Sequence, residues 1–161
     1  MIDRYLSLSY DELRSKKLLR MSSDLINEFY RELHIAIPEV RKKEGLAREY
    51  FFKYLKKITD DAEMLTRLRL SKATLGAELN EESIDYGVLK GIVKITILLR
   101  DYLSGRLLVT PDLHIVVKAQ EDLMYKGRLW RKGDIGSMDL VAAAFYYALD
   151  MIRPIQSSLS L

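Results

Sequence analysis

The sequence EGLAREYFFKYLKKITDDAEMLTRLRLSKATLGAEL, residues 44–79, contains no proline, and its one interior glycine lies near its end. Apolar residues recur along it mostly at steps of three and four, which places them on one side of a helix. At about 1.5 Å per residue this helix would be roughly 54 Å long. The stretch therefore predicts one long helix on which other helices pack and which projects toward a partner.

Five apolar residues of this stripe are our candidates for an oligomer interface: Phe51, Leu55, Ile58, Leu65 and Leu68. A long apolar face is typical of a chain that buries surface against another subunit. The alternative is that the stripe is only the inner face of the longest helix in a bundle.

The composition bounds the class of protein. A chain of 161 residues that is 48% hydrophobic forms one ordinary domain, or one domain with a small appendage. Without cysteine, and with only two histidines, it lacks thiol chemistry and the ligands of a typical transition-metal site. No window approaches the ~20 apolar residues of a membrane span. We expect a soluble, intracellular protein with no membrane contact and no cofactor.

The positive charge is concentrated in residues 41–72, which hold ten basic and five acidic side chains, against a net charge of +3 for the whole chain. A basic helix surface is either a footprint for phosphate backbones or a solvated face whose lysines cover apolar surface. The candidates here for partner or DNA contact are Lys53, Lys56, Lys57, Arg67 and Arg69.

Helix signals before the long stretch predict two shorter helices. Ser9 and Glu12 have the spacing of a capping box, which predicts a first helix over residues 10–20. Ser22 or Ser23 is a candidate N-cap for a second helix, and Pro38 should kink or end it.

Asn80 and two glutamates after it suggest the start of a fourth helix, and Gly105 suggests its end. Four helices with short connections predict a helical assembly domain over residues 1–105.

After Gly105 the pattern changes to short β-rich runs separated by turns. The predicted strands are 107–109, 113–117, 124–125, 129–130, 135 and 152–155, with a helix over 139–150. The expected fold is thus mainly α: a four-helix N-terminal domain with a long central helix, plus a small β-rich domain over residues 106–161.

No enzyme motif is present. The chain has no GxxxxGK[ST], GxGxxG, GxSxG or HExxH. The carboxylates of Asp60 and Asp61 are adjacent on a helix and diverge, so a salt-bridged surface explains them better than acid–base catalysis. Trp130, between Arg128 and Arg131, is either an anchor at a partner surface or a core residue of the small domain. We expect no catalytic activity.

Several short segments, in this order, resemble one protein family. They are residues 24–30 (DLINEFY), 67–72 (RLRLSK), 79–82 (LNEE), 116–117 (VV), 125–127 (YKG), 132–135 (KGDI) and Pro154. They are similar to segments of the GINS subunits, the non-catalytic accessory factors of the replicative helicase in archaea and eukaryotes. Asn80 stands where threonine is commoner in that family.

The resemblance implies an archaeal GINS subunit of the class with its helical domain first and its small β domain last. Such a subunit assembles with a sister subunit, here as a 2:2 hetero-tetramer, through the helical domains. The tetramer bridges the MCM helicase and a RecJ-like (Cdc45-related) protein during DNA replication, so the resemblance also implies a cytoplasmic, nucleoid-associated protein. A weak direct DNA contact stays open. The alternative from another class is a stand-alone nucleic-acid-binding protein that uses the basic surface of residues 41–72.

Overall fold

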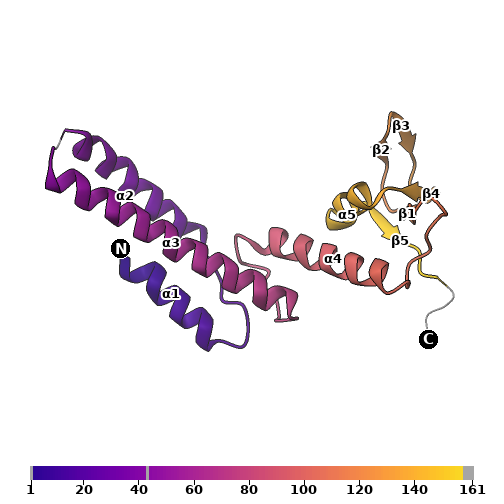
Figure 1. The fold of residues 1–161 in the computed structure, drawn as a ribbon, viewed down its shortest axis with the longest axis horizontal. Helices are drawn as coiled ribbons and strands as arrows, with labels where there is room; N and C mark the ends of the chain where they lie inside the picture. The colour runs from indigo at the N-terminus through magenta and orange to yellow at the C-terminus, as the bar shows by residue number, and fades with distance from the viewer. Residues whose placement is uncertain (1, 43, 158–161) are drawn as a thin grey trace. The chain divides into compact units, whose positions relative to one another are not determined.

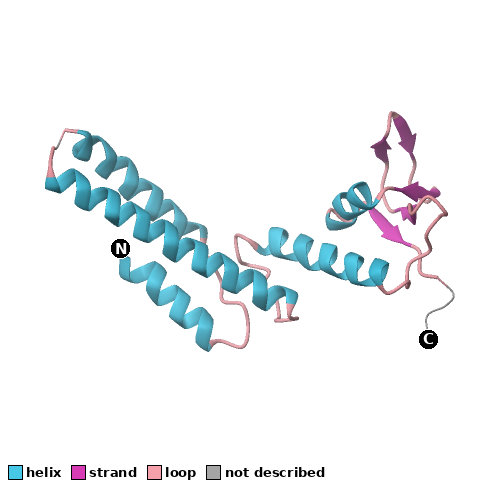
Figure 2. Ribbon diagram, in the orientation of Figure 1, coloured by secondary structure: helices cyan, strands magenta, loops and turns pink. Residues whose placement is uncertain are grey.

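The structure is a computed structural model that describes residues 2–42 and 44–157. It confirms a mainly α fold with a long central helix and a small antiparallel sheet in the C-terminal region (Figures 1 and 2). The chain divides into two compact units, residues 1–89 and residues 90–161. We call them the helical unit and the β unit.

The helical unit is built on the central helix. It comprises α1 (Ile2–Arg14), α2 (Ser23–Arg41) and α3 (Leu46–Thr74). Both α1 and α2 contact α3. The stripe of residues 44–79 thus serves first as a scaffold for two other helices of the same chain.

The helix signals at the start of the chain differ in their outcome. The prediction of a capping box is wrong, because Ser9 and Glu12 lie inside α1 and their side chains are buried. The predicted helix over 10–20 is likewise wrong, since α1 ends at Arg14. Ser22 does cap α2, where its hydroxyl accepts a hydrogen bond from the N–H of Leu25 at 3.4 Å.

The ends of α2 and α3 reflect proline and glycine chemistry. Helix α2 continues through Pro38 for three more residues, so of the two predicted effects, a kink or an end, the end does not occur. At the C-cap, the N–H of Lys42 donates to the carbonyl of Val40. Helix α3 ends at Thr74 rather than reaching residue 79, because Gly76 adopts a left-handed φ of 92°. Its length is therefore about 44 Å.

The fourth helix, α4 (Tyr86–Leu103), begins later than expected. Asn80 starts a turn in which its side-chain oxygen accepts from the N–H of Glu82 at 3.0 Å. The predicted end is confirmed: after Leu103 the chain turns at Gly105, whose φ is 70°.

The β unit combines most of α4 with a sheet and a second helix. The sheet has the order β4-β1-β5, from β1 (Ile115–Ala119), β4 (Ile135–Met138) and β5 (Ile152–Pro154). Strands β2 (Leu123–Tyr125) and β3 (Arg128–Trp130) form a separate hairpin, and α5 (Leu140–Ala148) is capped by Asp139. The predicted strand over 107–109 forms only isolated bridges, Leu107 with Gln156 and Val109 with Ile115.

The division between the units falls inside α4 rather than after Gly105. Leu98 of α4 is fully buried and belongs to the same core as Ile115, Val117 and Met138. The greater part of the predicted fourth helix therefore packs with the β unit.

Over the residues that the structure describes, none of the helices has the length and apolar character needed to cross a membrane.

Candidate interaction surfaces

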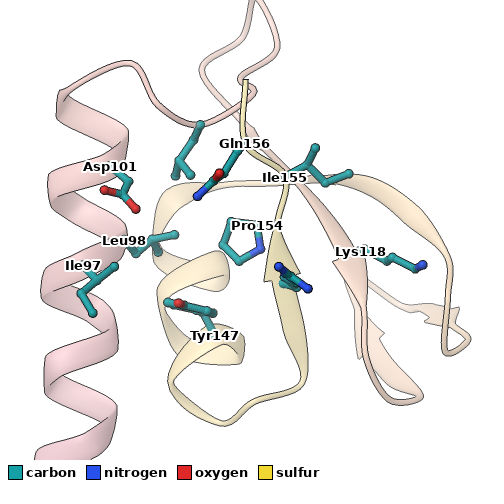
Figure 3. Close-up of a pocket in the computed structure, with 10 residues that line it drawn as sticks. Ile97, Leu98, Asp101, Lys118, Tyr147, Pro154, Ile155 and Gln156 are labelled. Carbon is teal, nitrogen blue, oxygen red and sulfur yellow. The ribbon is translucent and has the colours of Figure 1, made fainter. Parts of the chain in front are cut away.

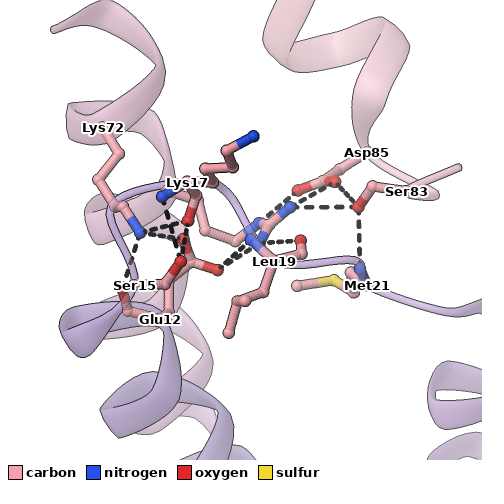
Figure 4. A network of polar contacts seen from close by, with 9 residues as sticks. Glu12, Ser15, Lys17, Leu19, Met21, Lys72, Ser83 and Asp85 are labelled. Atoms are coloured by element: carbon pink, nitrogen blue, oxygen red, sulfur yellow. Dashed lines mark hydrogen bonds and ion pairs between the residues drawn. The ribbon is translucent and has the colours of Figure 1, made fainter. Parts of the chain in front are cut away.

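A buried polar network holds the helical unit together (Figure 4). Arg69 of α3 is at the centre of this network. Its guanidinium donates to the carboxylate of Glu12 at 2.7 Å and to the carbonyl of Leu19 at 2.9 Å. It also donates to both carboxylate oxygens of Asp85, at 2.8 and 2.9 Å, and to the hydroxyl of Ser83 at 3.2 Å. One side chain thereby joins α1, the segment after α1 and the segment before α4.

Lys72 extends this network by one turn of α3. Its ammonium donates to the carboxylate of Glu12 at 2.6 Å and to the backbone carbonyls of Glu12 and Lys17. Because Arg69 is 3% exposed and fully engaged, the prediction that it contacts a partner or DNA is wrong. A buried guanidinium requires such pairing, since an uncompensated charge is costly to desolvate.

The network also sets the charge state of Asp85. Burial raises the pKa of this carboxyl, but hydrogen bonds from Arg69 and Ser83 and the positive charge of Arg69 outweigh it. The pKa of Asp85 therefore lies below its ordinary value of 3.8, and the side chain is ionised at neutral pH.

The other predicted basic residues lie on exposed faces of α3. Lys53 pairs with Glu49 at 2.7 Å, and Arg67 pairs with Glu63, both one helical turn away. Lys56 and Lys57 are exposed and have no ion pair with any residue that the structure describes. Of the five predicted contact residues on the long helix, these two lysines are therefore the ones without an acidic partner among the described residues.

The predicted interface stripe is largely internal. Ile58 and Leu65 are 5% and 3% exposed and lie in the interior of the helical unit. Phe51, Leu55 and Leu68 are partly buried. Ile58 and Leu65 are thus core residues, since their apolar surface is already covered by the same chain.

Large apolar side chains are instead exposed elsewhere on the helical unit, a feature that the stripe analysis missed. On α3, Leu46 is 71% exposed and Tyr50 is 68% exposed, and Phe52 also faces solvent. On α2, Tyr30 and Ile35 are exposed as well. Apolar residues outside the main stripe were the available sequence signal for this surface.

Trp130 is a core residue, which answers the question left open by the sequence. It is 8% exposed, and its ring packs edge-on against that of Tyr125, with 6.0 Å between the ring centroids. The ring also lies against Gly136, where an added Cβ would come within 2.5 Å of it. The neighbours Arg128 and Arg131 are exposed.

A groove of about 470 Å³ opens between α4, α5 and β5 (Figure 3). Asp101 of α4, Tyr147 of α5 and Gln156 supply polar atoms to its lining. The Asp101 carboxylate already accepts from Arg100 at 2.9 Å. Neither histidine lines this groove, and within the described residues no cluster of three or more acidic or histidine side chains is arranged to hold a metal ion.

Comparison with known proteins does not assign the chain to a group: no family model matches the sequence, and no curated protein matches it significantly.

Proposed function

We propose that this chain is a non-catalytic scaffold subunit of the GINS type, an accessory factor of the replicative MCM helicase. The proposal starts from the ordered segments that resemble the family, from residues 24–30 to Pro154. The succession of a helical unit and a small sheet-containing unit supports it.

The observation that carries the proposal is the exposed apolar surface of the helical unit. Leu46, Tyr50 and Phe52 of α3 and Ile35 of α2 each leave more than half of their surface in contact with water. Leu46 and Tyr50 are one turn apart on α3 and share a face, and exposed apolar patches of this kind are typical of protein–protein contacts. In the proposed 2:2 tetramer, a sister subunit covers this surface.

Nucleic-acid binding is the second candidate, because Lys56 and Lys57 keep unpaired positive charge. Four other basic residues of this stretch support it poorly. Arg69 and Lys72 are committed to the buried network, and Lys53 and Arg67 pair with glutamates.

The test is co-expression with a candidate sister subunit, followed by measurement of the mass of the complex in solution. The expected mass is that of two copies of each chain. Tyr50→Glu should abolish the complex by placing a charge in the covered surface, whereas the matched change Lys56→Glu should leave it intact. A complex that survives Tyr50→Glu would contradict the proposed surface.

The second candidate has a separate readout. If the isolated chain binds DNA with a steep salt dependence, and Lys56→Glu with Lys57→Glu removes that binding, the nucleic-acid-binding function is favoured. Salt-insensitive or absent DNA binding, together with tetramer formation, favours the scaffold.

In the proposed division of labour the helical unit carries assembly and the β unit recruits the RecJ-like protein, while the tetramer bridges it to MCM. Because Leu98 of α4 belongs to the core of the β unit, a truncation should end at Leu89 and not at Gly105. Pull-downs should then show a tetramer that has lost the RecJ-like protein. Loss of the tetramer itself would show that the β unit contributes to assembly.

A further inference from the structure

Strand β4 is an open edge of the sheet. The sheet order β4-β1-β5 leaves β4 with one neighbour, and the hairpin of β2 and β3 does not pair with it. An unpaired edge presents a row of N–H and C=O groups to which another strand can bind.

The alternation of hydrogen bonds along the sheet identifies which backbone groups of β4 are unpaired. The carbonyl of Val116 accepts from the N–H of Ile155, so the even-numbered residues of β1 bond toward β5. Since bonding directions alternate along an antiparallel ladder, the odd-numbered residues of β1 bond the even-numbered residues of β4. The N–H and C=O groups of Ile135 and Ser137 therefore face away from β1. No hydrogen bond among the described residues uses them.

A groove of about 330 Å³ lies beside this edge. It is lined by Arg128, Trp130, Asp134, Ile135, Gly136 and Ser137. The indole of Trp130 packs so closely on Gly136 that no side chain fits there, which gives the groove a rigid apolar wall. The open backbone groups and the groove thus share residues of β4.

The charges around the groove leave cations without partners. Arg128 lines the groove, and Arg131 and Lys132 follow in the next turn. All three are exposed and make no ion pair with any described residue. The nearby carboxylates are engaged by the backbone, since Asp134 accepts from the N–H of Arg131 at 2.9 Å and Asp122 accepts from the N–H of Lys132 at 2.8 Å. Acidic side chains of a partner would complement this surface.

We propose that the edge of β4 and its groove bind an extended acidic segment of a partner protein, which adds to the sheet as a fourth strand next to β4. Because side chains alternate along a strand, the segment would place apolar and acidic residues at alternate positions. This assignment gives a structural basis to the recruiting role proposed above for the β unit. That the partner is a protein rests on that proposed role.

The test uses the full chain and an eight-residue peptide of alternating glutamate and valine. Trp130 is the only tryptophan in the chain, so its fluorescence reports directly on the groove. Binding should change this fluorescence and raise the anisotropy of a labelled peptide. The same peptide with lysine in place of glutamate should bind at least ten-fold more weakly.

Two variants and their matched controls separate the backbone and charge contributions. Ser137→Pro removes an open N–H and is tolerated at a strand edge, so it should weaken binding about ten-fold, as the loss of one or two hydrogen bonds implies. Ser137→Ala should bind normally. Arg128→Glu should also weaken binding about ten-fold at low salt, whereas Lys56→Glu, on the helical unit, should not. Unchanged circular dichroism would verify the fold of each variant.

Three outcomes would overturn the proposal. The first is an unchanged peptide affinity in Ser137→Pro, and the second is equal affinity for the glutamate and lysine peptides. The third is a lower solution mass in Ser137→Pro and in no other variant, which would show that β4 pairs with a second copy of this chain. Tetramer formation with the sister subunit is measured on the same samples. A tetramer without peptide binding removes only the groove assignment, and peptide binding without a tetramer removes only the scaffold proposal.

Discussion

The two units of this chain are stabilised by different interactions. Among the residues whose burial is described, the β unit has a core cluster of ten buried apolar residues, from Leu98 to Ile152. The larger helical unit buries only five, and it adds the charged side chains of Glu12 and Arg69 at the interior junction of its segments.

The difference teaches which unit depends on the pairing of buried charges. An apolar cluster of helix and sheet residues satisfies the β unit internally. The helical unit instead relies on a polar network at one end. Both units leave large apolar side chains exposed, for example Tyr50 in the helical unit and Leu103 in the β unit. With its smaller apolar core, the helical unit gains more from a partner that covers such residues, which is consistent with the proposed role in assembly.

Substitution of Arg69 by Met should destabilise the helical unit but not the β unit, and it has the largest expected effect. It leaves Glu12, which is 1% exposed, with only Lys72 to compensate its charge. Removal of one partner of a buried pair costs about 3–5 kcal/mol. Hydrogen exchange should show loss of protection in α1 and α3, while Trp130 fluorescence stays native.

The matched control for this variant is Arg67→Met, two residues before Arg69 in the sequence. It removes the exposed ion pair of Arg67 with Glu63. Its expected effect is below about 0.5 kcal/mol. Equal effects of the two substitutions would show that the buried network does not hold the helical unit together.

Gly136→Ala tests the β unit in the same way but with a smaller expected effect. The new methyl group would lie 2.5 Å from the indole of Trp130, so the ring has to move within a packed core. Overpacking of this kind costs about 1–3 kcal/mol. Chemical denaturation followed by Trp130 fluorescence measures the loss.

Gly87→Ala, in the part of α4 that belongs to the helical unit, is the control, because an added Cβ there meets no side chain and no backbone of another element within 4 Å. Alanine favours a helix over glycine by about 1 kcal/mol, so this variant should be neutral or slightly more stable. Destabilisation by Gly87→Ala as large as that by Gly136→Ala would argue against the close contact with Trp130.

The smallest expected effect is a difference in acid sensitivity. Because the pKa of Asp85 is lower in the folded state than its ordinary value of 3.8, ionised Asp85 stabilises the helical unit above that pH. This stabilisation is lost as the pH falls through the lower, folded-state pKa. Asp85→Asn should therefore flatten the acid limb of a stability–pH curve, and Asp60→Asn, at an exposed site on α3, should leave it unchanged.

The sequence predicted the β unit more accurately than the helical unit, for a physical reason. Turn residues such as Gly127 and Gly133 adopt left-handed φ angles and separate the short strands, and Asp139 caps α5 through its own side chain. These are local effects that propensities capture. The capping box expected at Ser9 fails instead because of a tertiary contact, since Glu12 lies near the end of α1 and faces Arg69.

The functional residues show the same limit. Exposure of Lys56 and Lys57 follows from helical periodicity, and the structure agrees with it. The burial of Arg69 does not follow, because its carboxylate partners lie 57 and 16 residues away in the sequence. The open edge of β4 was equally inaccessible, since strand order in the sheet is a property of topology and not of any local pattern.

The wide sequence separation within the Arg69 network has a consequence for synthesis of the chain. Helix α1 leaves the ribosome before α3, and Arg69, the partner of Glu12, follows Glu12 by 57 residues. At about 5–20 residues per second, α1 waits roughly 3–12 s before it can dock on α3. During that interval the Glu12 carboxylate is hydrated, so α1 enters its final position only as the nascent chain supplies the cation that permits its burial.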